Sequence, residues 1–280
     1  MISRREIVIP AGVPVAGIDV GEDFLDLAIL NGDRSRLEYR RVAMAGIRSP
    51  VAKSLALRIA EAAPSLHRGA VAFVDSPRAP RDADCSGAMM TARRDAPAAR
   101  LIDATLRAML RSTPRCGVAA LSMFPTPTAD YFARCIASAA CKPHLRAIGE
   151  ELLAPLFDPQ ISTPSTVAGG LLFTRFMLVG FAAFRALEAM GVRAFECFPD
   201  LQFRLWSDGA TLPSKRQRSA ALSARQRACI RLVQKLGVAK FESPATLDEA
   251  DAAVLALSAA ASAERGGLIE LRCAPEGRFA

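Results

Sequence analysis

The segment that most restricts the fold lies near the N-terminus, where three short β-rich runs follow one another with little chain between them. Val13–Val20 and Phe24–Leu30 are rich in Val, Ile and Leu, and Asn31-Gly32-Asp33 leads into a third run, Arg36–Val42. Runs of this length bounded by Gly, Asn and Asp are typical of β-strands, and Asn-Gly is a strong hairpin signal. The sequence therefore predicts an antiparallel meander of three strands.

The rest of the chain alternates helical and strand patterns, which favours the α/β class. Ser49 and Pro50 suit the N-cap and the first position of a helix. The apolar run that ends at Asp75 is typical of a central strand covered on both faces. The later predicted elements are a loop over 78–92, helices over Arg94–Arg111, Val167–Met190, Lys215–Leu236 and 245–267, and strands over 192–199 and 268–273. The predicted order is β-β-β-α-β, a helical region, then β-α-α.

Residues 112–165 carry two Pro- and Thr-rich breakers, FPTPT and ISTPST, between mixed patterns. We interpret this stretch as a helical insertion or lid within a single domain spanning residues 1–280, because no linker of low complexity separates it from its neighbours.

The composition indicates a globular chain with affinity for polyanions. Of the 280 residues 51% are hydrophobic, which excludes a disordered or collagen-like chain. The formal net charge is +8, and a basic excess attracts nucleic acid or phosphorylated ligands. An Arg- and Ala-rich composition also arises from GC-rich coding, so both explanations remain open. Aromatic residues are few, and Phe203 and Trp206 beside Arg204 are the one candidate base-stacking group, although packing in the core is the better explanation for them.

The seven cysteines are scattered without CxxC pairs, which favours reduced thiols in a cytoplasmic protein. Cys135, Cys141 and His144 have the spacing C-x5-C-x2-H, which is a weak zinc signal without a second ligand pair. No secretory signal is expected at the N-terminus. The most apolar stretch, 168–191, is interrupted by Arg and Glu, so we expect a buried helix and no membrane span.

Acidic residues stand at the ends or starts of predicted elements, where ionised groups are costly to bury. They are Asp19, Asp75, Glu196, Asp248 and Asp251, the last two three residues apart and so on one helical face. A carboxylate cluster is tolerated when divalent cations neutralise it, and Mg²⁺ prefers carboxylates, water and phosphate oxygens. Two such ions about 4 Å apart can clamp the attacking and leaving oxygens in phosphodiester hydrolysis.

Each acid also has a structural interpretation. Asp19 and Asp75 could begin turns at strand ends, and Glu196 could point to water from an edge strand. Thr246 and Glu249 have capping-box spacing, so Asp248 could be an ordinary acid of a first helical turn. Asp251 is harder to explain this way, since apolar residues surround it.

The order of these motifs resembles a known family. GIDVG, AFVDSP, R-x-x-D-x-x-L-R at Arg100–Arg107, FECFP and DEADA occur in the order seen in the predicted-nuclease family catalogued as domain of unknown function 429, and the last motif is similar to the closing helix of Holliday-junction resolvases. The resemblance implies a ribonuclease H-like mixed five-stranded sheet of order 3-2-1-4-5, whose first three strands are antiparallel, flanked by helices.

The resemblance also implies a bound pair of Mg²⁺ or Mn²⁺ ions and a site. Asp19 would be the ligand from the first strand, Asp75 or Glu196 the acid from the parallel strands, and Asp251, with Asp248, the ligands from the last helix. The segment after Asp75-Ser76-Pro77 is longer and richer in Arg than the family's loop.

A nucleolytic site needs positive charge to position phosphates, whether the nucleic acid is DNA or RNA. The candidate substrate-binding residues are Arg78, Arg100, Asp103, Lys215 and Arg216. Two alternatives to a nuclease stay open. GIDVG also resembles the first phosphate loop of actin-like phosphotransferases, which would bind ATP at the Gly21 turn. A non-catalytic binding module on the same fold is the other.

Overall fold

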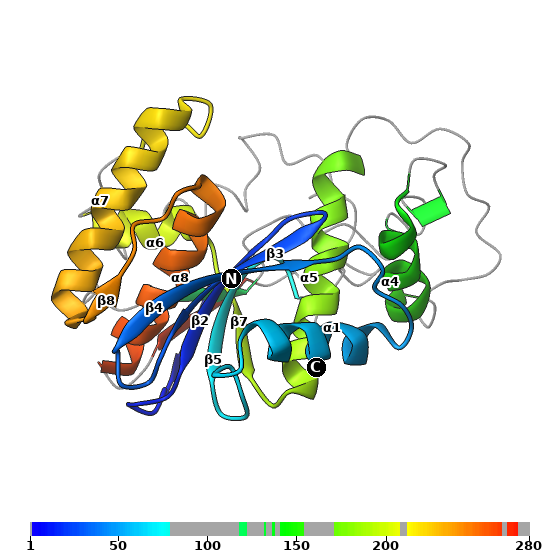
Figure 1. The fold of residues 1–280 in the computed structure, drawn as a ribbon, viewed down its shortest axis with the longest axis horizontal. Coiled ribbons are helices and arrows are strands. Elements are labelled where there is room, and N and C mark those ends of the chain that lie inside the picture. The colour runs from blue at the N-terminus through cyan, green and yellow to red at the C-terminus, as the bar shows by residue number, and fades with distance from the viewer. Residues whose placement is uncertain are drawn as a thin grey trace.

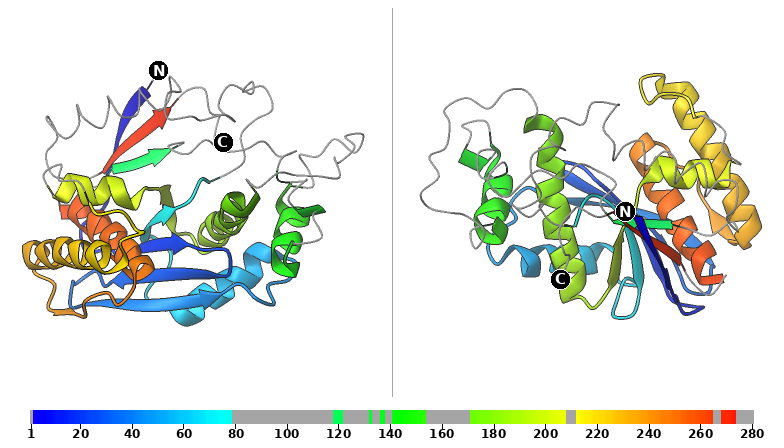
Figure 2. Two further views of the ribbon diagram at one scale, coloured as in Figure 1. Left: turned by 90° about the horizontal axis from the view of Figure 1, so that it is seen from above. Right: turned by 180° about the vertical axis from the view of Figure 1, so that it is seen from behind.

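The computed structural model describes residues 2–78, 118–121, 132, 136–137, 141–153, 171–207, 212–264 and 268–273. Within them the chain forms an α/β arrangement in which a six-stranded mixed sheet has helices on both faces (Figure 1). A separate three-stranded sheet lies at one end (Figure 2).

The predicted antiparallel meander forms the heart of the larger sheet. It consists of β2 (Val15–Val20), β3 (Phe24–Leu30) and β4 (Arg36–Ala43), paired in succession. On its other side β2 pairs in parallel with β5 (Val71–Asp75), which pairs in parallel with β7 (Arg193–Glu196).

A sixth strand distinguishes this sheet from the five-stranded one expected. It is β8 (Lys240–Phe241), two residues long and parallel to β4. The full order is β7-β5-β2-β3-β4-β8. So short a strand carries no periodic signal, and it exists because the chain after a helix passes along the free edge of β4.

The smaller sheet has the order β1-β9-β6. β1 (Ile2–Ile7) is antiparallel to β9 (Leu268–Cys273), and β6 (Val118–Leu121) is parallel to β9. The strand predicted over 268–273 is present, but nothing in the sequence indicated its pairing with β1. The stretch 112–165, expected to be helical, contributes β6 as well as α4 (Pro143–Leu153).

The helices divide between the two faces of the larger sheet (Figure 1). On one face are α1 (Val51–Ala62), α4 and α5 (Leu171–Ala189). On the other are α6 (Pro199–Trp206), α7 (Arg218–Leu236) and α8 (Leu247–Glu264). None of the described helices combines the length and apolar character needed to cross a membrane.

Several boundaries differ from those predicted by one to three residues, and two of these differences bear on the predicted site residues. The strand expected over 192–199 ends at Glu196, because Pro199 begins α6, where its fixed φ suits the first helical turn. The helix expected from Lys215 begins at Arg218, so Lys215 lies in the preceding loop and not on a helical face. The predicted helix over Arg94–Arg111 and the loop over 78–92 lie outside the described residues, apart from Arg78.

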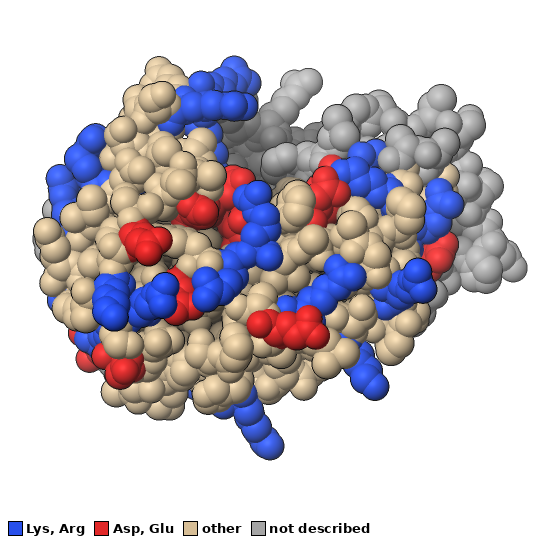
Figure 3. Space-filling model, viewed as in Figure 1, with Lys and Arg blue, Asp and Glu red and all other residues tan. Residues whose placement is uncertain are grey.

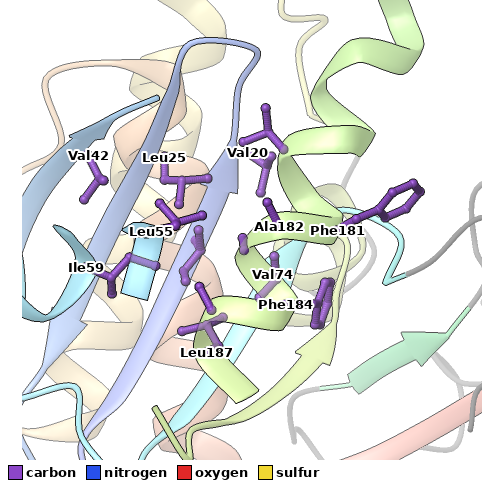
Figure 4. Packing of buried hydrophobic residues seen from close by; sticks show 14 of the residues in the cluster. Val20, Leu25, Val42, Leu55, Ile59, Val74, Phe181, Ala182, Phe184 and Leu187 are labelled. Atoms are coloured by element: carbon purple, nitrogen blue, oxygen red, sulfur yellow. The ribbon is translucent and has the colours of Figure 1, made fainter. Parts of the chain in front are cut away.

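Alternation along the strands separates two hydrophobic cores. Ala16, Ile18 and Val20 of β2 face α1 and α5, whereas Val15 faces α8. Figure 4 shows the first core, in which side chains of α1 and α5 pack on the sheet; those labelled are Val20, Leu25, Val42, Leu55, Ile59, Val74, Phe181, Ala182, Phe184 and Leu187. Every residue from Ala250 to Ala263 is buried, because α8 lies between the sheet and the helices α6 and α7.

The contact between α8 and β2 is unusually close at Gly17. A Cβ at this position would lie 1.9 Å from the carbonyl oxygen of Ala252 and 2.6 Å from the Cβ of Leu255. The helix backbone therefore rests directly on the backbone of β2. Glycine is needed here for space, and the small residues of α8 permit the same approach from the helix side.

We predict that Gly17→Ala lowers the free energy of unfolding by about 3 kcal/mol, because the added methyl group forces α8 away from the sheet. Chemical denaturation monitored by circular dichroism measures this. Ala43→Val, which enlarges an exposed side chain of β4, is the control and is expected to change stability by less than about 0.5 kcal/mol. Equal stability of Gly17→Ala and wild type would contradict the close approach of α8.

Candidate metal centre

A row of four charged side chains crosses the larger sheet on the face covered by α8. Asp19 of β2 is paired in register with Asp75 of β5 on one side and with Asp26 of β3 on the other, and Asp26 is in turn paired with Arg41 of β4. Directly paired residues on neighbouring strands project to the same face. The row Asp75–Asp19–Asp26–Arg41 therefore lies at the carboxyl ends of β2 and β5, where open α/β sheets commonly bind ligands.

The first two turns of α8 bring two more carboxylates to this row. Thr246 accepts a hydrogen bond at its Oγ1 from the backbone N–H of Glu249 at 3.1 Å, and the Glu249 carboxylate accepts one from the backbone N–H of Ala245. These bonds fix the start of the helix, as the capping-box spacing predicted. Asp248 and Asp251, one turn apart, then face the row, and charge repulsion from both acts on Asp19.

Basic side chains enter the cluster from three directions. The Lys215 ammonium, about half exposed, donates to Oδ2 of Asp251 at 2.5 Å. The buried Arg225 guanidinium of α7 donates to Oδ1 of Asp251 at 3.2 Å and to Oδ1 of Asp200 at 2.8 Å. The Arg41 guanidinium donates hydrogen bonds to both carboxylate oxygens of Asp26, at 2.7 and 3.0 Å. Asp251, completely buried, thus has two cationic partners.

The charges of Asp19 and Asp75 are less well compensated than that of Asp251. Among the described residues neither has a Lys or Arg partner within ion-pair distance. Burial raises the pKa of Asp19 well above its usual range, and repulsion from Asp75 and Asp251 raises it further. Burial and the charge of Asp251 raise the pKa of Asp75 to about 7, although Lys215 and a hydrogen bond with Asp19 oppose the shift. Burial and mutual repulsion therefore favour the protonated forms of these two adjacent carboxyl groups as long as no cation compensates their charge.

Asp251 and Lys215 complete the electrostatic picture. Burial raises the pKa of Asp251, and Lys215 and Arg225 act against that shift. Burial lowers the pKa of Lys215, but the nearby Asp251, Asp19 and Asp75 outweigh it, so the net pKa is raised. Lys215 stays charged and partly neutralises the cluster.

The cluster has the donor chemistry of a divalent cation site. One carboxylate oxygen from each of Asp19, Asp26 and Asp248 lies within 4.8 Å of the other two. Oδ1 of Asp75 is buried and has no hydrogen-bond partner among the described residues. Carboxylate oxygens alone favour Mg²⁺ or Mn²⁺ over softer metals. The residues present therefore fit such an ion.

Four of the five acids predicted as metal ligands or catalytic residues lie in this cluster: Asp19, Asp75, Asp248 and Asp251. Glu196 does not. It is paired in register with Val74, which faces α1 and α5, so it projects to the opposite face, where Oε2 accepts a hydrogen bond from the backbone N–H of Arg78. This pairing argues against Glu196 as a partner of Asp19.

The predicted substrate-binding residues also separate. Lys215 lies in the cluster, and Arg216 is exposed in the loop beside it. Arg78 lies over the ring of Phe184, on the face away from the row. Arg100 and Asp103 lie outside the described residues. So does Cys135 of the weak zinc pattern, while Nε2 of His144 lies 3.0 Å from the backbone carbonyl oxygen of Glu22.

Sequence reasoning missed Asp26 and Arg41. A signal was available, because only Gly21, Glu22 and Asp23 separate β2 from β3, and a hydrogen bond from the backbone N–H of Gly21 to the carbonyl oxygen of Phe24 leaves Glu22 and Asp23 at the tip of the turn. A two-residue turn sets the register and places Asp26 directly opposite Asp19. The register of β4 depends on a longer turn after Leu30, so Arg41 was not predictable in the same way.

Comparison of the chain with protein-family models, with curated proteins and with solved structures finds no match.

We predict that the metal-free protein loses stability as the pH rises from about 4 to about 7. In this window the unfolded chain releases the Asp75 proton while the folded protein keeps it, because the folded pKa is about 7. Asp75→Asn removes the part of this loss that comes from Asp75 and from its repulsion of Asp19, and raises the free energy of unfolding at pH 8 by about 2–4 kcal/mol relative to wild type. Urea denaturation in chelator at several pH values measures the slope. Glu61→Gln, at an exposed position of α1, should keep the wild-type slope, and an unchanged slope in Asp75→Asn would contradict the raised pKa.

We also predict that Arg225→Met lowers the free energy of unfolding by about 3 kcal/mol, because it removes a cationic partner from the buried Asp251. Arg227→Met changes an exposed residue of the same helix and should leave stability within about 0.5 kcal/mol of wild type. Thermal and chemical denaturation of the two variants distinguish a structural ion pair from general loss of positive charge; equal effects would refute the pairing.

Proposed function

We propose that this protein is a metal-dependent nuclease of ribonuclease H-like fold, which hydrolyses phosphodiester bonds in nucleic acid with Mg²⁺ or Mn²⁺. The observation that carries the proposal is the carboxylate row Asp75–Asp19–Asp26 beneath the acidic first turn of α8. Asp19 and Asp75 are half-buried and repel each other, so a bound cation would compensate a repulsion that the protein itself leaves largely unopposed.

The topology supports the fold part of the proposal. Leaving aside β8, the strands lie in the order β4-β3-β2-β5-β7, with an antiparallel meander followed by two parallel strands. This is the arrangement that the family resemblance implies. It brings the ends of β2 and β5 together with a late helix, so that distant parts of the chain supply the carboxylates.

Asp19, Asp26 and Asp248 are the residues that would hold a cation, and Asp75 offers its unpartnered Oδ1 to the same region. A bound divalent cation polarises phosphoryl oxygens and activates water for attack at neutral pH. The carboxylates of the cluster outnumber its basic side chains, so the site retains negative charge that a cation can neutralise.

Basic side chains at the rim would bind the phosphate backbone of the substrate. Figure 3 shows Lys and Arg side chains beside acidic ones on the face seen in Figure 1. Arg41 and Lys215 are each about half exposed while still touching the carboxylates. The net charge of +8 adds a long-range attraction for polyanions that weakens with salt.

We predict that the wild-type protein cleaves DNA or RNA only in the presence of Mg²⁺ or Mn²⁺. Asp19→Asn should lower the cleavage rate at least about 100-fold, because substitution even of residues that only hydrogen-bond to metal ligands lowers metal affinity or activity about 10–100-fold. The same cations should raise the thermal midpoint of the wild type by mass action, and Asp19→Asn should lose this shift. Glu242→Gln, at an exposed position after β8, is the control and should keep both properties.

Three other results would contradict the proposal. Cleavage that persists in Asp19→Asn would place the chemistry elsewhere. Stabilisation by ATP, with no response to nucleic acid, would favour the phosphotransferase alternative. Salt-dependent binding of nucleic acid without cleavage, unaffected by Asp19→Asn, would indicate a non-catalytic binding module. Turnover should be measured on single- and double-stranded DNA and RNA, so that a narrow substrate preference is not mistaken for inactivity.

A further inference from the structure

An exposed aromatic ring stands beside the carboxylate row. Phe24, the first residue of β3, is 41% exposed. Among the described residues the other large hydrophobic side chains so exposed are aliphatic: Val8, Leu57 and Ile230. A single exposed apolar side chain is ordinary, but an aromatic ring at the edge of a charged site offers a flat face on which a planar ligand can pack.

Arg41 forms a flat neighbour for that ring. Its Cζ lies 5.0 Å from the centroid of Phe24, while its guanidinium donates to both carboxylate oxygens of Asp26. The two-point contact fixes the plane of the guanidinium, so Arg41 is held in place before any ligand arrives. Its side chain is still 49% exposed. The pair thus presents a rigid apolar and cationic surface to solvent.

The position of this pair relative to the acids is set by the strands. Phe24 and Asp26 are two residues apart on β3, so they project to the same face about 7 Å apart. Arg41 is the register partner of Asp26. The exposed ring and guanidinium therefore border the same row that contains the candidate cation ligands.

We propose that Phe24 and Arg41 form a stacking platform for an unpaired base, and hence that the substrate strand is single-stranded next to the cleaved bond. This inference rests on the proposed function. Bases stack on aromatic rings and on guanidinium planes whatever their sequence, and a paired base inside a duplex does not expose its face. The positive charge of Arg41 also suits the phosphate that accompanies each base. A platform of this kind selects strand structure and not sequence.

We predict that Phe24→Ala weakens binding of a short oligothymidylate about tenfold or more, because each stacked base contributes about 1–3 kcal/mol. Binding of the full chain is measured by fluorescence anisotropy, first in chelator and then with Ca²⁺. The same strand lacking its bases should bind wild type and Phe24→Ala equally. Phe24→Tyr should retain tight binding. Thermal midpoints check that each variant is folded, and Phe24→Leu replaces Phe24→Ala if the latter is not.

Adjacent arginines supply a matched control. Arg41→Lys keeps the charge but loses the planar group, so it should weaken binding of the intact strand several-fold. Arg40→Lys changes the next residue of β4, which projects to the opposite face, and should bind like wild type. In Phe24→Trp, quenching of the new fluorescence by the oligonucleotide, beyond any change from Trp206 in wild type, would report stacking directly.

The outcomes separate this inference from the proposed function. If Phe24→Ala binds the intact strand as tightly as wild type, or loses affinity equally for the strand without bases, the platform is wrong, and the nuclease proposal still depends on Asp19→Asn. If binding requires Phe24 but no metal supports cleavage, the platform holds and the nuclease proposal fails. If wild type binds no single strand, or prefers a duplex, the platform is overturned; absence of any nucleic-acid binding overturns both.

Discussion

The close packing of α8 on β2 at Gly17 is the contact on which both the core and the candidate site depend. Because no side chain intervenes, the helix lies against the sheet over most of its length and buries small apolar residues on all sides. The same approach brings the first two turns of α8, with Asp248 and Asp251, close to Asp19. A displacement of the helix would therefore loosen the core and separate the carboxylates together. The stability of the core and the geometry of the candidate site therefore depend on the same contact between α8 and β2.

The electrostatic cost of the site is distributed unevenly. Asp251 and Asp26 each have a fixed guanidinium partner, so their charges are largely compensated within the protein. Asp19 and Asp75 lie side by side with raised pKa values and no comparable partner. Functional sites often retain such unfavourable arrangements because a ligand, and not the protein, supplies the compensating charge. Lys215 comes from a loop and its side chain is half exposed, so its ammonium group is the partner that could most easily move away from Asp251 if a cation bound.

Some residues of the candidate site could be predicted from the sequence and others could not. Asp19, Asp75, Asp248 and Asp251 were identifiable because each stands where a strand ends or a helix begins. Glu196 satisfied the same pattern, yet the parallel register of β7 against β5 turns it to the other face. Asp26 and Arg41 lie inside strands, where no motif marks them. The short turn before β3 could have placed Asp26 opposite Asp19, but only the pairing of β4 with β3 places Arg41 opposite Asp26. Phe24 could not be singled out either, because the solvent exposure of its side chain cannot be read from the sequence.

The sequence by itself determined the local elements: the meander, the apolar strand before Asp75, the capped acidic start of α8 and the α/β class, since these follow from hydrophobic periodicity and turn chemistry. Tertiary structure alone decided the rest. The pairing of β9 with β1 and β6 and the addition of β8 arise from contacts between distant segments. So does the face to which each acid points, because a shift of one residue in register reverses every side chain of a strand.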